Sequence, residues 1–128
     1  MNYIKKLREV KPLVHNITNY VTVNDVANAI LAIGGSPIMS DEITEVAQMT
    51  SISNALNINI GTLNQVKIAS MFEVGKASNA CHHITVLDPV GAGATDLRTN
   101  TCKELLEQIH FDAIKGNVSE IKTLMAGT

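Results

Sequence analysis

Residues 84–109 read ITVLDPVGAGATDLRTNTCKELLEQI, and this stretch carries the pattern that identifies the fold class. A short run of β-branched and apolar residues over 84–87 is followed by a glycine-rich turn and then by a helical pattern over 99–109. The same order of strand and helix recurs before and after this stretch. Alternating strands and helices without hairpin signals predict an α/β fold, in which a mainly parallel sheet carries helices on both faces.

Outward from this stretch, the remaining elements follow the same alternation. We expect strands over 13–17, 37–40, 55–60, 84–87 and 113–114, and helices over 2–10, 22–33, 44–52, 64–77, 99–109 and 119–125. Gly34 and Gly35 stand where the second helix should end, as glycine commonly does. A chain of 128 residues is long enough for one domain, so residues 1–128 are assigned to one α/β domain.

Composition and charge exclude several classes of function. Aromatic residues make up only 3% of the chain, so the core must be built from aliphatic side chains, which suits buried parallel strands. The net charge is −2 and no basic stripe occurs, which argues against a nucleic-acid partner. No apolar run approaches the length of a membrane span. Cys81 and Cys102 have no metal or redox spacing, which favours reduced thiols in a cytoplasmic protein.

Polar and glycine residues gather after the predicted strands, where ligands bind in open α/β sheets. Asp88 and Glu120 follow two separate strands, and if these are neighbours both carboxylates can face one Mg²⁺. Gly91 and Gly93 allow the backbone to approach a charged ligand closely, and free N–H groups at these positions are expected to hold phosphate oxygens. Lys115 offers a positive charge to a phosphate.

Each of these motifs also has a purely structural interpretation. Asp88-Pro89 is often no more than a junction between a strand and a turn. Asn117 and Glu120 have the spacing of a helix cap with an acid at its third position. The sequence from Gly91 to Gly93 is neither a dinucleotide fingerprint nor a Walker A motif, which disfavours a dinucleotide-dependent dehydrogenase.

The histidines are not expected to form a metal site. His15 lies within the first predicted strand and is interpreted as a hydrogen-bonded core residue. His82 and His83 are adjacent, so they would point to opposite faces if they lay on a strand.

Five segments together resemble the hydroxyethylthiazole kinase family, in the family's order and at about its spacing. They are LVHNITNYVT at 13–22, GGSPIM at 34–39, NIGTL at 59–63, DPVGAGA at 88–94 and IKGNVSEI at 114–121. The family's members are about twice as long. The resemblance therefore implies the truncated, N-terminal half of a ribokinase-like α/β kinase domain.

The resemblance implies an activity and a set of site residues. The family phosphorylates the hydroxyl of 4-methyl-5-(2-hydroxyethyl)thiazole with ATP and Mg²⁺ in thiamine salvage, and it is usually a homotrimer with sites at subunit interfaces. By position, Met39, Gly61 and Thr62 are expected near the thiazole. Asn19 and Lys115 are expected on the phosphate side of ATP, and Asp88 and Glu120 near the metal. Many members carry Arg at the position of Lys115. Lysine keeps the positive charge of arginine but lacks its planar fork of donors.

The family's catalytic base and glycine-rich anion hole lie in its C-terminal half, and no residue here matches them. We therefore expect little or no activity from this chain alone. Two alternatives stay open. The chain is a non-catalytic fragment that needs a partner chain, or it belongs to a related ribokinase-like kinase for a hydroxymethylpyrimidine or a sugar.

Overall fold

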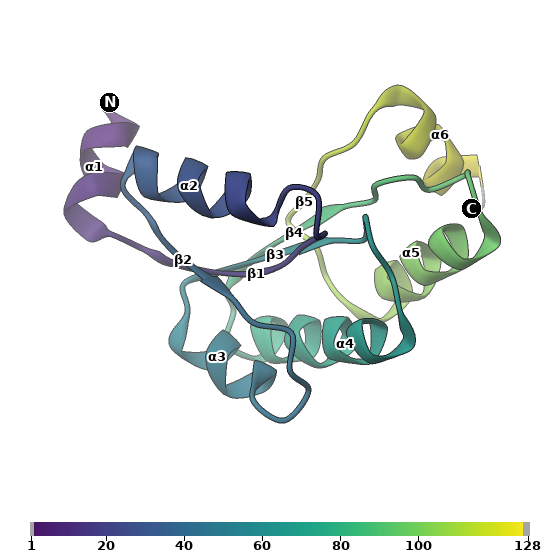
Figure 1. The fold of residues 1–128 in the computed structure, drawn as a ribbon, viewed down its shortest axis with the longest axis horizontal. Helices are drawn as coiled ribbons and strands as arrows, with labels where there is room; N and C mark the ends of the chain where they lie inside the picture. Colours follow the sequence, from purple (N-terminus) through teal and green to yellow (C-terminus); the bar gives the residue numbers. More distant parts are fainter. Residues whose placement is uncertain (1, 127–128) are drawn as a thin grey trace.

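A computed structural model describes residues 2–126, in which parallel strands form one sheet in the order β2-β1-β3-β4-β5 (Figure 1). The strands are β1 Leu13–Ile17, β2 Ser36–Met39, β3 Ala55–Asn59, β4 Ile84–Asp88 and β5 Ala113–Ile114. The helices are α1 Tyr3–Val10, α2 Val23–Ile33, α3 Val46–Ile52, α4 Gln65–Ala80, α5 Asp96–Gln108 and α6 Val118–Ala126. The predicted α/β class and parallel sheet are confirmed.

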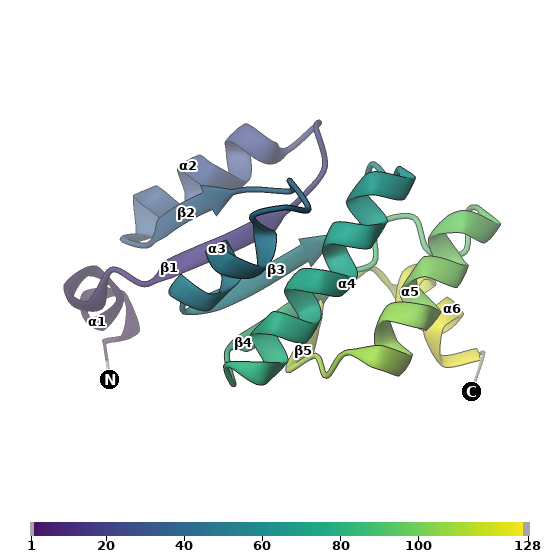
Figure 2. The same cartoon turned by 90° about the horizontal axis from the view of Figure 1, so that it is seen from below.

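Helices cover both faces of the sheet, as predicted. In Figure 1, α1, α2 and α6 lie on one face, whereas α3, α4 and α5 lie on the other. Figure 2 views the molecule from the side of α3, α4 and α5, which lie nearer to the viewer than the sheet.

The core lies between the sheet and helices α3, α4 and α5. Successive strand residues point to opposite faces of the sheet, so every second residue of a strand reaches this core. Leu56 and Ile58 of β3 and Leu87 of β4 are at most 1% exposed and pack with apolar residues of the helices. Their neighbours Asn57 and Val86, which point to the face of α2 and α6, are only half-buried. The two faces of the sheet are therefore unequally covered.

Local signals explain where the helices begin and end. Gly34 ends α2 with a φ of +110°, in the left-handed region that favours glycine, as predicted. Helix α5 begins at Asp96, three residues before the expected Thr99, because the Thr95 hydroxyl caps it by accepting a hydrogen bond from the Arg98 N–H at 3.3 Å.

The histidines lie in two different settings. His15 is buried, and its Nε2 donates to the carbonyl of Ser40 at 2.8 Å, while the Thr50 hydroxyl lies 2.9 Å from its Nδ1. The core role of His15 is confirmed. His82 and His83 lie in the turn before β4, where His82 is exposed and has a φ of +58°, so neither of them lies on a strand.

Candidate active site

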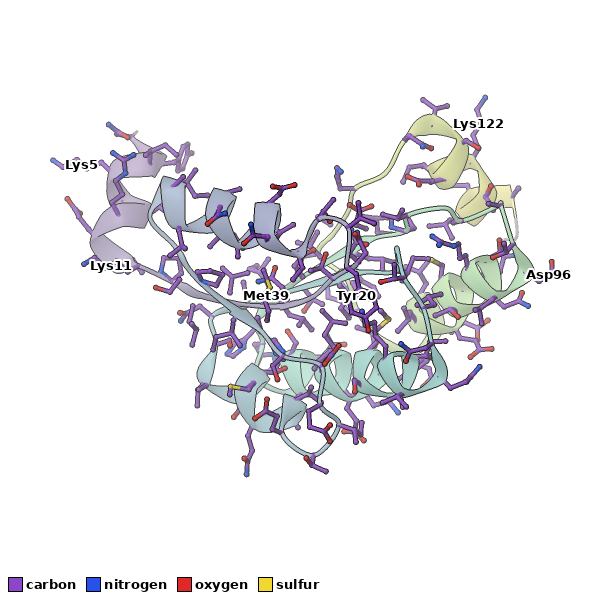
Figure 3. The ribbon with its side chains drawn as sticks, viewed as in Figure 1. Lys5, Lys11, Tyr20, Met39, Asp96 and Lys122 are labelled. Atoms are coloured by element: carbon purple, nitrogen blue, oxygen red, sulfur yellow. The ribbon has the colours of Figure 1, made fainter. Side chains whose placement is uncertain are left out.

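Two cavities open where the strands end at their carboxyl edges. The Asp88 cavity, of about 530 Å³, is lined by Asn19, Val21, Thr22, Val26, Asn59, Gly61, Asp88, Val90 and Lys115. The Met39 cavity, of about 200 Å³, is lined by Asn16, Ile17, Thr18, Tyr20, Val23, Met39, Ser40, Asp41 and Lys67. The loop between β1 and α2 contributes residues to both, so the cavities are neighbours. Figure 3 shows Met39 and Tyr20 in the middle of the molecule.

The structure brings most of the predicted site residues to these cavities. Asn19, Gly61, Asp88 and Lys115 line the Asp88 cavity, and Met39 lines the other. Thr62 belongs to the lining of neither, but its hydroxyl accepts a hydrogen bond from the Tyr20 N–H at 3.3 Å. Thr62 therefore supports the loop that separates the two cavities.

Asp88 and Lys115 form an ion pair across two neighbouring strands. The Asp88 carboxylate ends β4 and is 17% exposed, while the Lys115 ammonium follows β5 and is 79% exposed. Their closest atoms, Asp88 Oδ2 and Lys115 Nζ, lie 3.3 Å apart. Such an exposed pair is worth only about 0–1 kcal/mol, so the flexible ammonium is free to turn toward a phosphate instead.

Asn19 and Gly61 are fixed through Asn59, which the sequence interpretation did not single out. Asn59 Oδ1 accepts hydrogen bonds from Asn19 Nδ2 at 3.0 Å and from the Gly61 N–H at 2.9 Å. Asn19 Oδ1 in turn accepts from the Val21 and Thr22 N–H groups, each at 3.0 Å. A Cβ on Gly61 would lie 2.7 Å from Asn19, so this close approach requires glycine.

Glu120 uses both carboxylate oxygens in hydrogen bonds to the backbone. Its Oε2 accepts from the Gly91 N–H at 2.8 Å and its Oε1 from the Asn117 N–H at 2.9 Å. The Asn117 side chain accepts from the Glu120 N–H at 2.8 Å, which completes the reciprocal capping box considered from the sequence. Glu120 therefore ties the start of α6 to the loop after β4.

Two backbone N–H groups of the glycine-rich loop after β4 donate hydrogen bonds to side chains of the neighbouring helices. The Gly91 N–H donates to Glu120, and the Gly93 N–H donates to the Thr99 hydroxyl at 2.9 Å. The expectation of free N–H groups at these two positions is therefore wrong. The positive φ angles at Gly91 and Gly93, +77° and +95°, aim these groups at side-chain acceptors within the protein.

Known proteins that resemble this chain identify its family. A model of the hydroxyethylthiazole kinase family matches residues 4–128. The chain belongs to the hydroxyethylthiazole kinase family. A hydroxyethylthiazole kinase of Clostridium acetobutylicum is 56% identical over 124 residues, which are 97% of this chain and 45% of that protein. One of Clostridium beijerinckii is 57% identical over 119 residues, covering 93% and 43%.

A solved structure shares the fold as well as the sequence. The structure of the hydroxyethylthiazole kinase protein from Pyrococcus horikoshii superposes with a TM-score of 0.93 at 44% identity, over 97% of this chain and 48% of that one. The chain thus spans about half the length of the hydroxyethylthiazole kinase family members that it matches.

Within the described part of the chain, the carboxylates around these cavities do not form a complete metal site by themselves. Among residues 2–126, no three His, Cys, Asp or Glu side chains are grouped so that they could hold a metal ion by themselves. Mg²⁺ usually keeps several waters and binds one or two carboxylates together with substrate phosphates. Asp88, which faces the larger cavity, fits this description.

The charges of Asp88 and Glu120 both influence the pKa of the buried thiol of Cys102. Burial raises the pKa of Cys102 to about 12, the negative charges of Glu120 and Asp88 add to this rise, and Arg98 opposes it. The charges of both acids therefore disfavour the thiolate form of Cys102.

Arg98 is a further site residue that the sequence interpretation missed. Its Nη1 donates to the carbonyl of Val90 at 2.8 Å, and its Nη2 donates to the carbonyl of Gly61 at 2.6 Å. One guanidinium therefore joins the loop after β3 to the loop after β4, both of which line the Asp88 cavity. The turn signal at Gly91–Gly93 placed a helix after it, but nothing in the sequence showed that an arginine of that helix would reach back to Gly61.

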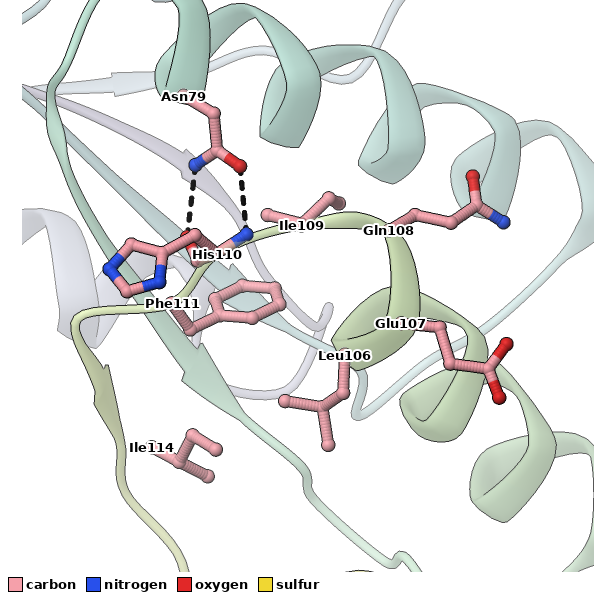
Figure 4. Close-up of a pocket in the computed structure, with 8 residues that line it drawn as sticks. All are labelled: Asn79, Leu106, Glu107, Gln108, Ile109, His110, Phe111 and Ile114. Carbon is pink, nitrogen blue, oxygen red and sulfur yellow. Dashed lines mark hydrogen bonds between the residues drawn. The ribbon is translucent and has the colours of Figure 1, made fainter.

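Another cavity, of about 560 Å³, lies at the opposite end of the strands (Figure 4). Leu106, Ile109, Phe111 and Ile114 contribute apolar side chains to it. At its rim, the Asn79 side chain exchanges two hydrogen bonds with the backbone of His110, at 2.8 and 2.9 Å. It lies at the amino ends of β4 and β5, where ligands of open α/β sheets do not ordinarily bind.

No helix within residues 2–126 combines the length and apolar character needed to cross a membrane.

Proposed function

We propose that this chain supplies the alcohol-binding part and much of the phosphate-binding part of an ATP-dependent hydroxyethylthiazole kinase. The reaction would phosphorylate the hydroxyl of 4-methyl-5-(2-hydroxyethyl)thiazole in thiamine biosynthesis or salvage, in the cytoplasm. One observation carries the proposal: residues from four strand ends, Asn19, Gly61, Asp88 and Lys115, line one cavity beside Met39. The family membership and the names of the relatives support the choice of substrate.

The Met39 cavity is proposed to hold the ring of the alcohol, with Gly61 and Thr62 near its edge. Its volume of about 200 Å³ suits one small substituted ring, since pockets for drug-sized ligands measure roughly 300–1,000 Å³. Methionine sulfur makes favourable contacts with aromatic rings, which supports Met39 as a packing partner.

The Asp88 cavity is proposed to hold the phosphates of ATP. Lys115 can exchange its weak pairing with Asp88 for a phosphate oxygen, and Asn19 lines the same cavity. When bound, Mg²⁺ would neutralise phosphate charge, with Asp88 and Glu120 as its proposed acids. Each carboxylate oxygen has two lone pairs, so the oxygens of Glu120 can still accept from a metal-bound water while they hold the backbone.

The residues of this chain mainly position groups and supply charge. No side chain near the Asp88 cavity is assigned as the base that takes the proton of the alcohol, and we propose that this group belongs to the remaining length found in the relatives. The complete enzyme is proposed to be a homo-oligomer, a trimer by family resemblance. The chain alone is then inactive, although it retains the ring cavity.

Reconstitution tests this proposal. The chain would be co-expressed with the C-terminal half of the Clostridium acetobutylicum kinase, and ADP formation would be measured with the thiazole alcohol, a hydroxymethylpyrimidine and ribose. We expect turnover with the thiazole alcohol, and about a 100-fold or larger loss for Asp88→Asn, since removal of one charge-stabilising group commonly costs this much. Asp25→Asn, at an exposed position on α2, is the matched control.

Other outcomes would select the alternatives. Preference for the pyrimidine or the sugar would assign the chain to a different ribokinase-like kinase. Absence of turnover, together with heat of binding for the thiazole alcohol, would favour a non-catalytic binding fragment. An unchanged rate for Asp88→Asn would remove Asp88 from the metal site.

A further inference from the structure

Lys67 is a buried cation at an unfavourable position. It lies in the first turn of α4, and its side chain is only 3% exposed. Burying an ammonium is costly, and the positive end of the helix dipole adds to that cost. Burial lowers the pKa of Lys67, while the charge of Asp41 works in the opposite direction. Such a cation is kept in place only by specific contacts around it.

These contacts come from two loops that form walls of the Met39 cavity. Lys67 Nζ donates a hydrogen bond to the Thr18 carbonyl at 2.9 Å and lies 4.1 Å from the centre of the Tyr20 ring. It also lies 4.0 Å from Asp41 Oδ2, on the loop after β2. Thr18, Tyr20, Asp41 and Lys67 all line the Met39 cavity. The ammonium therefore sits between the two walls and contacts both.

The wall at Thr18 depends on this ammonium. Thr18 is 7% exposed, and its hydroxyl oxygen is one of the buried side-chain atoms within residues 2–126 that lack a hydrogen-bond partner. Its own side chain thus does not fix the loop on the side of the Met39 cavity. On the other side, the bond from Asn19 to Asn59 holds the loop toward the Asp88 cavity. The two sides of the loop between β1 and α2 are therefore held by different residues, Lys67 and Asn59.

We propose that Lys67 is a positioning residue that sets the shape of the Met39 cavity and thereby the affinity for the ring alcohol, without contributing to nucleotide binding. This inference rests on the proposed function. The ammonium holds Thr18 and Tyr20 against Asp41 so that the ring meets a preformed cavity. Loss of the ammonium frees the walls on the alcohol side only, because Asn59 still holds Asn19.

Calorimetric titrations of the chain, one with the thiazole alcohol and one with MgATP, test whether Lys67 affects the binding of the alcohol alone. Lys67→Met should raise the Kd for the alcohol about tenfold or more, the loss expected when a hydrogen bond to a charged group is removed, and leave the Kd for MgATP unchanged. Lys67→Arg, which keeps the charge and a donor, should recover part of the affinity. Lys76→Met, at an exposed position on the same helix, should match the wild type.

A second pair of variants covers the case in which Lys67→Met does not fold. Tyr20 is 68% exposed, so its replacement should leave the fold intact. Tyr20→Leu should weaken alcohol binding and Tyr20→Phe should not, because only the ring is needed over the ammonium. If wild type and Lys67→Met, or wild type and Tyr20→Leu, bind the alcohol equally, this inference is overturned and the proposed function stands. If the wild type binds no alcohol while it binds MgATP, the substrate assignment falls and this inference falls with it.

Discussion

The carboxylate of Glu120 accepts the N–H of Gly91 at 2.8 Å, which joins the first turn of α6 to the glycine-rich loop after β4. These residues lie 29 positions apart in the chain. The contact makes the loop beside Asp88 dependent on a residue that also caps its own helix, so the stability of α6 and the geometry of the site are linked.

Replacement of Glu120 should therefore destabilise the fold. Glu120→Ala leaves the N–H groups of Gly91 and Asn117 without their acceptor, at an expected cost of about 1–3 kcal/mol. Glu120→Gln retains one acceptor oxygen and should cost less. Urea unfolding measures the difference, with Glu104→Ala on the exposed face of α5 as the control. Equal midpoints for Glu120→Ala and the control would show that these bonds contribute nothing.

Arg98 should be poorly replaced by lysine. The guanidinium bonds two carbonyls on separate loops, and one ammonium lacks the planar fork that spans them. Arg98→Lys should therefore speed hydrogen exchange in the loops around Gly61 and Val90, while exchange in the core of α4 stays slow. Lys103→Arg on the same helix is the control. Protection of both loops that stays at the wild-type level would contradict the bridging role.

Gly75 should be intolerant of a side chain because of its packing against Ile109. A Cβ at Gly75 would overlap the Ile109 side chain, and both residues are buried where α4 meets the end of α5. Gly75→Ala should cost about 1–3 kcal/mol through overpacking. Adding Ile109→Val should recover part of the loss, which a double-mutant cycle by thermal unfolding would measure. Additive effects of the two changes would argue against the contact.

His15 predicts a pH dependence of folding stability. Burial lowers the pKa of His15 in the folded protein below its ordinary value of 6.5, against smaller opposing effects of Ser40 and Glu45. The unfolded chain then binds more protons below that pH, so stability is full above about pH 6.5 and falls as the pH drops below it. Urea unfolding between pH 7.5 and 5.5 should show this fall. His15→Gln should flatten it and His82→Gln should not; an unchanged slope in His15→Gln would assign the effect elsewhere.

The fold could be predicted largely from local signals. Apolar runs such as 84–87 and glycines such as Gly34 mark the strands and helix ends by themselves, so the parallel sheet followed from their order. The boundary of α5 was misplaced because the Thr95 cap, rather than apolar periodicity, decides where that helix begins.

The site could be predicted only in part. Asn19, Gly61, Asp88 and Lys115 follow strands, and parallel strands bring their carboxyl ends together, so their common cavity is a consequence of topology. The contacts of Arg98, Asn59 and Lys67 depend on how helices and loops pack across the sheet. Such cross-element contacts have no periodic pattern in the sequence. The N–H groups at Gly91 and Gly93 were misjudged for the same reason, since their acceptors are Glu120 and Thr99.

The binding site of the nucleotide phosphates can be located by titrating the isotope-labelled chain with MgATP and recording its backbone amide chemical shifts. We expect the largest shifts around the Asp88 cavity, at Asn19, Gly61, Val90 and Lys115, and we expect Asp88→Asn to weaken them. Shifts that gather instead around Asn79, Ile109 and His110, or that are unaffected by Asp88→Asn, would contradict the proposed phosphate site.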